Sequence, residues 1–329
     1  MKQKTWKTSL IWLGVLVVFA NGCRGKETSS RLSIGLMPKL VGIDYFNACE
    51  RGAQEAAREL DLKLVYEGPI TNDVTRQAEM LDTWITRKID VIAVAPNDPH
   101  ALAPTLKRAM KRGIKTLTWD ADSDPDSRNY FVNQATYQDI GYGLVDVMAE
   151  QMGTQGEVAI VTGSLTAANQ NIWMEWMRKR MAEKYPGMNI VAVKPSEEDQ
   201  KLAFQVSQDL IKAYPNLKGV FGITSISLPG AAQAVRDSGY SGKIAVTGLT
   251  TPNSLRQYVK DGTVKTFLLW NPVDLGYLTV YAAKKLHDDG KLPEQFVAGR
   301  LGKIRVDSST ILLGPPLHFT KENIDQFDF

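Results

Sequence analysis

The sequence predicts an α/β fold with two doubly wound parallel-sheet lobes, and three observations lead to this prediction. Short apolar runs alternate with longer amphipathic segments, which is typical of parallel strands covered by helices on both faces. The alternation extends to about residue 132 and then starts again. About 300 residues remain after the N-terminal leader, which suits two domains of ordinary size.

In the first half of the chain, each apolar run is followed by polar residues and then by a helical pattern. The expected strands are residues 32–36, 62–66, 91–94, 116–119 and 130–132, and the expected helices are 46–60, 73–87 and 101–112. Gly113 ends the last of these helices. Because strands and helices alternate with short connections, this half is expected to form the first lobe.

The second half repeats the alternation. The expected helices are residues 140–151, 169–185, 200–214 and 229–238, and the expected strands are 158–161, 190–193, 220–222 and 244–247. The last two segments, 266–270 and 276–287, are expected to return toward the first lobe.

Polar residues that directly follow the strands are the first candidates for a binding site. In open parallel sheets a ligand sits at the carboxyl ends of the strands, and two facing lobes place a cleft there. Asp120 and Asp122 follow one such strand. We expect one of them to accept hydrogen bonds from a ligand, and we do not expect the pair to act as acid and base.

The N-terminus has the layout of a secretory signal. Lys2, Lys4 and Lys7 precede an apolar run over residues 10–20, which is too short to span a bilayer comfortably. Cys23 follows, and its position resembles a bacterial lipobox, in which the cysteine is acylated and becomes the new N-terminus. We therefore expect a signal peptide over 1–22, a lipidated polar tether over 23–30, and an exported protein anchored to a membrane.

Charge and cysteine content exclude several classes of protein. The formal net charge is +3, but the leader holds three lysines and no acid, so the remaining chain is neutral and nucleic acid is not expected as a partner. If Cys23 is acylated, Cys49 has no disulfide partner and is expected to be a small buried residue. The histidines are scattered, so no metal site is expected.

Signatures of enzymes are absent from the sequence. No Gly-x-Gly-x-x-Gly follows a strand, and neither a phosphate-binding loop nor a Gly-x-Ser-x-Gly elbow occurs. We therefore expect no cofactor, no catalytic residue and no enzymatic activity.

Six motifs in order along the chain carry a resemblance to a known family. They are IGLMPKLVG at 34–42, LTWDAD at 117–122, NQNIW at 169–173, LPGAAQA at 228–234, WNPVDLG at 270–276 and NIDQF at 323–327. The chain resembles type I periplasmic solute-binding proteins of sugar ABC importers, and the nearest branches bind rhamnose or autoinducer-2. The resemblance covers nearly the whole chain after the leader.

The resemblance implies a periplasmic binding protein-like I fold, in which two lobes joined by a three-segment hinge close around one sugar. By that pattern the first lobe comprises 31–134 plus 271–303, and the second comprises 135–270 plus 304–329. The implied partners are a monosaccharide and an ABC permease, and the implied state is a monomer.

The matching residues divide between the two branches. Lys39, Asp120, Gln170, Pro229 and Ala231 fit the binding residues of the autoinducer branch. Position 169 departs from it, because that branch has an aspartate where this chain has an asparagine. The NQNIW and WNPVDLG motifs look more like the rhamnose branch. Since an amide both donates and accepts hydrogen bonds, the asparagine favours an ordinary deoxyhexose over the autoinducer.

Sugar chemistry supports the same set of residues on physical grounds. Hydroxyl groups require carboxylate and amide partners, and the apolar C–H faces of a sugar require aromatic rings. The candidates for hydroxyl groups are Asp120, Asn169, Gln170 and Asn271, and the candidates for the apolar faces are Phe46, Trp173 and Trp270. Core packing is the alternative for Phe46 and Trp173, and solvent exposure is the alternative for Lys39.

Two other functions fit the sequence less well. A repressor of the same architecture would need an N-terminal helix-turn-helix, where this chain has a signal peptide. A secreted enzyme would need an acid and a base across the cleft, where this chain has mainly amides. Two alternatives stay open: an autoinducer-2-binding protein, and a sensor subunit that presents bound sugar to a membrane receptor.

Overall fold

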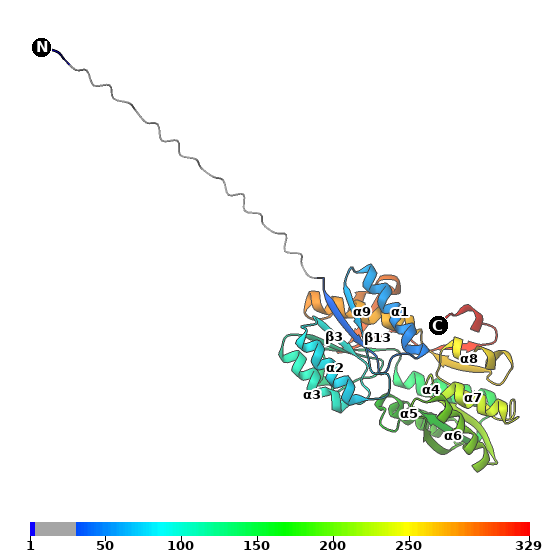
Figure 1. The fold of residues 1–329 in the computed structure, drawn as a ribbon. Coiled ribbons are helices and arrows are strands. Elements are labelled where there is room, and N and C mark those ends of the chain that lie inside the picture. The colour runs from blue at the N-terminus through cyan, green and yellow to red at the C-terminus, as the bar shows by residue number, and fades with distance from the viewer. Residues whose placement is uncertain (4–30) are drawn as a thin grey trace. The chain divides into compact units, whose positions relative to one another are not determined.

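The computed structural model describes residues 1–3 and 31–329 (Figure 1). Most of the expected signal peptide, together with Cys23 and the tether, therefore lies outside the described residues. Residues 31–329 form one compact unit. This unit consists of two α/β lobes with parallel sheets, which confirms the fold class predicted from the sequence. In the described part of the chain, no helix is long and apolar enough to cross a membrane.

The first lobe is built on an eight-stranded sheet with the order β11-β12-β13-β5-β4-β3-β1-β2. Its strands are β1 (Ser33–Met37), β2 (Lys63–Tyr66), β3 (Val91–Val94), β4 (Lys115–Trp119), β5 (Tyr130–Asn133), β11 (Gln295–Val297), β12 (Lys303–Asp307) and β13 (Thr310–Leu312). The first five strands pair in parallel, and β13 joins them in parallel beside β5. Strands β11 and β12 extend the sheet by antiparallel pairing.

Helices cover both faces of this sheet. They are α1 (Asp44–Glu59), α2 (Val74–Thr86), α3 (Pro99–Lys111) and α9 (Pro272–Asp289), with α1 and α9 on one face and α2 and α3 on the other (Figure 1). On β3, Val91 and Ala93 face the first pair of helices, whereas Ile92 and Val94 face the second, because successive side chains of a strand alternate. This double coverage explains the uninterrupted apolar runs in the sequence.

Two glycines let α1 and α9 approach each other backbone to backbone. A Cβ atom on Gly52 would lie 1.8 Å from the carbonyl oxygen of Val273, and one on Gly276 would lie 1.9 Å from that of Cys49. Any side chain at either position would force the helices apart. Cys49 itself is buried, as expected from the sequence, and has no disulfide partner among the described residues.

The second lobe has a four-stranded parallel sheet with the order β7-β6-β8-β9. Its strands are β6 (Gln155–Thr162), β7 (Gly187–Pro195), β8 (Leu217–Gly222) and β9 (Ala245–Gly248), followed by the antiparallel pair β10 (Thr266–Leu269) and β14 (Leu317–Thr320). A bridge between Leu249 and Leu268 places β10 next to β9. The helices are α4 (Tyr137–Met152), α5 (Ala168–Lys184), α6 (Gln200–Ala213), α7 (Ser227–Asp237) and α8 (Pro252–Lys260).

The chain passes between the lobes three times: after β5, after β10, and between β13 and β14. The last crossing corrects the expected boundary at 303. Strands β12 and β13 belong to the first sheet because β13 pairs with β5, so the first lobe extends to Leu312. The expectation for 266–270 is also corrected. Residues Thr266–Leu269 pair with β14 in the second lobe, and only α9 returns to the first.

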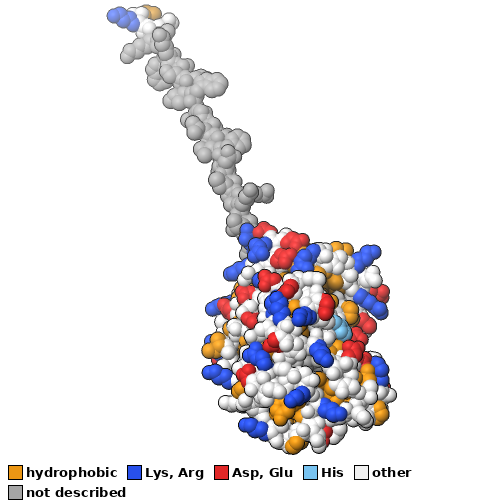
Figure 2. Space-filling view, turned by 90° about the vertical axis from the view of Figure 1, so that its right-hand side faces the viewer, with side chains coloured by type: hydrophobic (Ala, Val, Ile, Leu, Met, Phe, Trp, Pro, Cys, Tyr) orange, Lys and Arg blue, Asp and Glu red, His pale blue; other side chains and the backbone are white. Residues whose placement is uncertain are grey.

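Charged side chains of both signs share one face of the molecule. On the face shown in Figure 2, basic and acidic side chains intermingle, and hydrophobic side chains lie scattered among them. An even mixture of charges produces no large field of one sign that would attract a polyanion.

Candidate ligand-binding site

A cavity lies between the two lobes, at the carboxyl ends of their parallel strands. Its volume is about 60 Å³. In this measure one water molecule needs roughly 10–15 Å³, so the cavity has room for a small solute. The lining side chains are Lys39, Leu40, Ile43, Tyr45, Phe46, Asp120, Asn169, Gln170, Trp173, Glu198, Ile223, Thr224, Ser225, Leu249, Leu269 and Trp270.

Asp120 occupies the turn that follows β4. Its backbone is in the left-handed region, with φ at +63°, and aspartate is one of the few non-glycine residues that tolerate this conformation. The backbone N–H of Asp120 donates to the carbonyl of Val132, which pins the turn against β5. Strain held at one position by its surroundings is common at binding sites, because it fixes the direction of a side chain.

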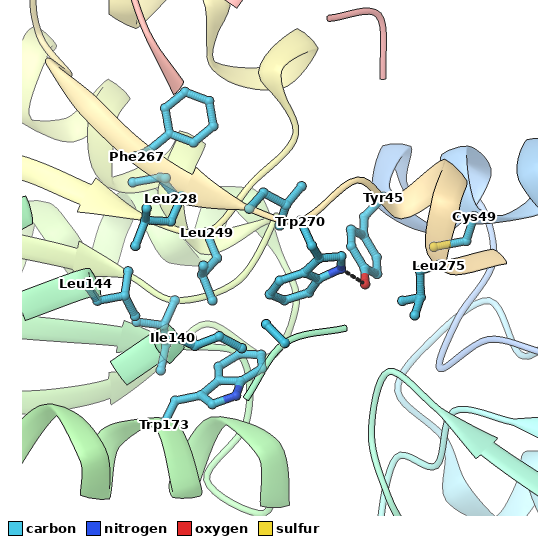
Figure 3. Close-up of a cluster of buried hydrophobic side chains, with 14 of the residues drawn as sticks. Tyr45, Cys49, Ile140, Leu144, Trp173, Leu228, Leu249, Phe267, Trp270 and Leu275 are labelled. Carbon is cyan, nitrogen blue, oxygen red and sulfur yellow. Dashed lines mark hydrogen bonds between the residues drawn. The ribbon is translucent and has the colours of Figure 1, made fainter. Parts of the chain in front are cut away.

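The carboxylate of Asp120 is held by an aromatic relay. The Tyr45 hydroxyl donates to Asp120 Oδ1 at 2.6 Å, and Trp270 Nε1 donates to the Tyr45 hydroxyl at 2.8 Å. Figure 3 shows the second of these bonds, with Trp270 between Tyr45 of α1 and the side chains of the second lobe. The relay therefore joins the first lobe to the crossing segment after β10.

Burial dominates the electrostatics of this relay. Desolvation raises the pKa of Asp120, and the nearby Lys39 and the hydrogen bond from Tyr45 act in the opposite direction. Desolvation also raises the pKa of Tyr45 far above its ordinary value, with the charge of Asp120 as the next cause. Tyr45 therefore remains a neutral hydrogen-bond donor, and a ligand that donates to Asp120 would stabilise the carboxylate further.

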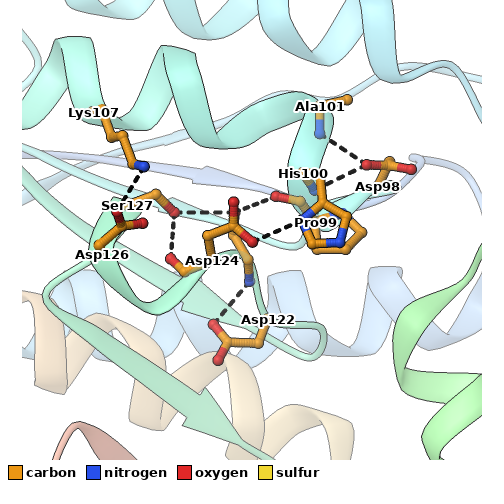
Figure 4. Close-up of polar contacts among 10 residues, drawn as sticks. Asp98, Pro99, His100, Ala101, Lys107, Asp122, Asp124, Asp126 and Ser127 are labelled. Carbon is orange, nitrogen blue, oxygen red and sulfur yellow. Dashed lines mark hydrogen bonds and ion pairs between the residues drawn. The ribbon is translucent and has the colours of Figure 1, made fainter.

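Asp122 has a different environment, although it lies only two residues away. Its carboxylate accepts from Arg128 Nε at 2.9 Å and from Arg128 Nη2 at 2.6 Å, and Thr118 donates to it at 2.5 Å. It also accepts from the backbone of Ser123, in the polar loop beside the start of α3 (Figure 4). Asp122 thus stabilises this loop and does not line the cavity.

Buried amides hold the loop that carries Lys39. Gln77 donates to the carbonyl groups of Pro38 and Ala95, and Asn97 Nδ2 donates to the carbonyl of Lys39 at 2.9 Å. The Lys39 side chain then reaches across the cavity, where Nζ donates to Asn169 Oδ1 at 3.1 Å. This bond connects the two lobes directly.

The second wall of the cavity begins at the first turn of α5. Gln170 Oε1 accepts from the Thr162 hydroxyl at 2.5 Å and from the backbone N–H of Gly163 at 2.8 Å, so its amide has one orientation. Asn169 is buried, and because its oxygen accepts from Lys39, its Nδ2 group is left to donate toward a ligand.

Aromatic side chains form the apolar part of the cavity. Phe46 packs edge-on against Tyr45, with the ring centroids 5.0 Å apart, and the Trp173 and Trp270 rings lie 6.1 Å apart. Trp173 Nε1 is buried and has no hydrogen-bond partner in the described part of the chain. An unpaired buried donor on a cavity wall costs free energy that a ligand acceptor would recover.

Three of the residues expected at the site do not line the cavity. Asn271 Oδ1 accepts from the backbone N–H of Val273 and of Asp274, so this side chain caps the N-terminus of α9. Pro229 and Ala231 are buried in α7, with Pro229 in the first turn, where its missing N–H has no consequence. The other seven line the cavity: Lys39, Phe46, Asp120, Asn169, Gln170, Trp173 and Trp270.

Sequence reasoning missed several residues that line the cavity. Tyr45 lies beside the expected Phe46, and its partnership with Asp120 links positions 75 residues apart, which no local pattern reveals. Glu198 lies in a polar loop after β7, where a charged residue ordinarily faces solvent. The one usable signal was its place after a strand, since the strand-end rule applies to that loop as well.

Two α/β lobes, three crossings and a cavity lined from both lobes define a two-lobed solute-binding protein. The chain belongs to the periplasmic binding protein family, since the family's model, described as a periplasmic binding protein domain, matches residues 34–292. This confirms the resemblance described from the sequence. Members of the family bind solutes for transport and are not enzymes, which agrees with the expectation of no catalytic activity.

Solved structures of similar proteins cover nearly all of the compact unit. A sugar ABC transporter protein from Actinomyces odontolyticus is 34% identical, with a TM-score of 0.74 over 90% of this chain and 97% of that one. A solute-binding protein from Clostridium phytofermentas with bound L-rhamnose is 27% identical, with a TM-score of 0.85 over 90% and 98%. LsrB from Clostridium saccharobutylicum in complex with AI-2 is 25% identical, with a TM-score of 0.85 over 90% and 99%.

Proposed function

We propose that this protein captures one monosaccharide in the interlobe cavity and delivers it to an ABC permease. The observation that carries the proposal is the composition of the cavity. Carboxylate, amide and ammonium groups from both lobes surround a small space with aromatic walls. Hydroxyl groups of a sugar would pair with the polar set, and its C–H faces would pack on Phe46, Trp173 or Trp270.

The first candidate ligand is a rhamnose-like deoxyhexose. Its methyl group would suit the apolar side of the cavity, where Leu249 and Leu269 lie beside Trp270. Asn169 supports this choice because its amide donates to a hydroxyl oxygen, whereas an aspartate would only accept. The similarity to a rhamnose-bound protein is a further support.

Autoinducer-2 is the second candidate, and Lys39 is the observation that favours it. The lysine enters the cavity from the loop after β1, and Asp120 and Gln170 line the same space. These three positions fit the autoinducer branch, and a structure with bound AI-2 is as similar in fold as the rhamnose-bound one.

A titration against a panel of ligands separates the candidates. Trp173 and Trp270 line the cavity, so intrinsic tryptophan fluorescence would report occupancy directly. We expect saturable binding of L-rhamnose and weaker binding of D-ribose, D-allose and autoinducer-2. Tight autoinducer-2 binding with no response to rhamnose would reverse the assignment. Turnover of any sugar would contradict a transport role.

We further propose that the protein is exported as a lipid-anchored monomer. This rests on the leader and on Cys23, which lies outside the described residues. Cys23→Ser should move the protein from the membrane fraction to the soluble fraction, and sedimentation of the released protein should give the mass of one chain. A wild-type protein that is soluble and keeps its leader would contradict the anchor.

A further inference from the structure

Glu198 is a charged group on the cavity wall that no motif in the sequence indicates. It lies in the short loop between β7 and α6, which leaves the sheet at Pro195. Glu197 and Glu198 both have left-handed backbones, with φ at +50° and +54°. Two consecutive non-glycine residues in this region are costly, and such strain is retained where the surrounding structure fixes a side chain for a purpose.

The Glu198 carboxylate packs closely against the backbone of Gly163. A Cβ atom on Gly163 would lie 1.9 Å from Glu198 Oε1, so only glycine at that position allows this contact. Gln170 Nε2 donates to the same oxygen at 3.4 Å, and Thr224, from the loop after β8, lines the same cavity. Since Thr162 and Gly163 fix the other end of the Gln170 amide, Glu198 is positioned by a chain of contacts that starts in β6.

The charged side chains that line the cavity do not neutralise each other. Its lining includes two carboxylates, Asp120 from the first lobe and Glu198 from the second, and one cation, Lys39. Burial raises the pKa of both carboxyl groups, and Lys39 opposes this effect at each of them. With both carboxylates ionised, the cavity holds an excess of one negative charge in a largely apolar enclosure, which is costly unless a ligand offers hydrogen-bond donors or a cation.

We infer that Glu198 is a ligand-binding carboxylate of the second lobe, which with Asp120 makes the site accept neutral or amine-bearing sugars and reject acidic ones. This inference rests on the proposed function. Sugar hydroxyl groups, or an ammonium group, would donate to both carboxylates at once, one on each side of the ligand. A uronic or aldonic acid would instead bring a further anion beside two existing ones, and like charges at short range exclude a ligand.

The adjacent residue provides a matched control for the test. Glu197 has the same side chain and the same backbone conformation, but it is exposed and does not line the cavity. Glu197→Gln and Glu198→Gln therefore remove the same formal charge from adjacent positions of one loop. Only the second substitution removes a carboxylate from the cavity.

The experiment titrates wild type and both variants with the best-bound neutral sugar of the panel. Glu198→Gln should weaken binding roughly 10- to 100-fold, since a hydrogen bond to a charged group is lost, and Glu197→Gln should change it less than about 2-fold. Unchanged binding in Glu198→Gln, or equal losses in both variants, would overturn the inference while leaving the proposed function intact. No binding of any panel sugar by wild type would overturn both.

A second measurement uses wild type alone and applies even if Glu198→Gln does not fold. The bound neutral sugar is challenged with D-glucuronate, D-galacturonate and D-glucosamine at millimolar concentrations. We expect neither uronate to displace it, and any displacement to come from the amino sugar. A uronate that competes as well as a neutral sugar would contradict the assigned charge selectivity.

Discussion

The two lobes contribute walls of different character to the same cavity. On the wall from the first lobe, Tyr45 and Trp270 hold Asp120, and buried amides hold the Lys39 loop. In the second lobe, Trp173 Nε1 is a buried donor without a partner among the described residues, and Glu198 lies on a strained loop. Both walls are organised before a ligand arrives, but the second keeps a buried donor, Trp173 Nε1, that a ligand would complete.

This difference assigns separate tasks to the walls. A preorganised wall orients a ligand without paying for its own rearrangement on binding. A wall with unpaired groups gains most from the ligand, so it would favour the closed arrangement only when the cavity is occupied. Lys39 connects the two because its side chain crosses to Asn169.

The largest effect is expected for Asp122→Ala, which tests whether Asp122 stabilises the first wall or binds the ligand. Asp122→Ala would leave Arg128 buried without its bidentate partner, since the Arg128 side chain is only 4% exposed. We expect a loss of about 3 kcal/mol in the free energy of unfolding, measured by chemical denaturation. Sugar affinity below the melting transition should be unchanged. A loss of affinity at full folding would place Asp122 in the binding site.

Asp120 should show the opposite behaviour. Asp120→Ala removes a charged acceptor from the cavity and should weaken sugar binding by roughly 1.5–3 kcal/mol, which is about one to two decades in the dissociation constant. Calorimetric titration would measure this change. Asp126→Ala is the control, because Asp126 is exposed and pairs with Lys107 at the surface. Equal binding by both variants would make Asp120 a purely structural residue.

Asn169→Asp tests the position where the two walls meet, since Asn169 pairs with Lys39 of the first lobe. The new carboxylate would still accept from Lys39, but it would replace the Nδ2 donor and add a negative charge near Glu198. We expect rhamnose binding to weaken about tenfold, measured by calorimetry, because a donor is lost where a hydroxyl oxygen needs one. Stronger rhamnose binding by Asn169→Asp would contradict the role given to the amide.

The smallest expected effect concerns stability without ligand. Burial raises the pKa of Asp120, so the folded state favours the protonated carboxyl group. Its contribution to stability is fully present below the ordinary pKa near 4 and is lost as the pH rises through the raised pKa. Asp120→Asn, which keeps an acceptor for Tyr45, should therefore raise the melting temperature at pH 7 but not near pH 4. Thermal unfolding at both values tests this. An equal decrease of the melting temperature at pH 7 and near pH 4 would contradict this expectation.

Strand and helix patterns of the first lobe and of the parallel part of the second were readable from the sequence, because full burial produces long apolar runs. Strand β3 was expected over residues 91–94 and lies there. The strands at the edge of the first sheet were missed, since only alternate residues of β12 are buried and β13 has only three residues. The boundary error at 303 follows directly from that omission.

The candidate site shows where sequence reasoning stops. The strand-end rule found Lys39, Asp120 and Asn169, because parallel strands bring their carboxyl ends to one edge. The same rule does not distinguish a ligand group from a helix cap, and Asn271, expected at the ligand, caps α9 and does not line the cavity. Glu198 was missed because its place in the cavity depends on backbone strain and on contact with Gly163, neither of which leaves a pattern.

We expect the two walls of the cavity to bind one sugar together. Calorimetric titration of the protein with L-rhamnose, repeated with Asp120→Ala and Glu198→Gln, tests it most directly because one variant alters each wall. We expect one sugar per chain for wild type and a marked loss of affinity in both variants. Tight binding that neither substitution weakens, or no binding of any monosaccharide by wild type, would contradict it.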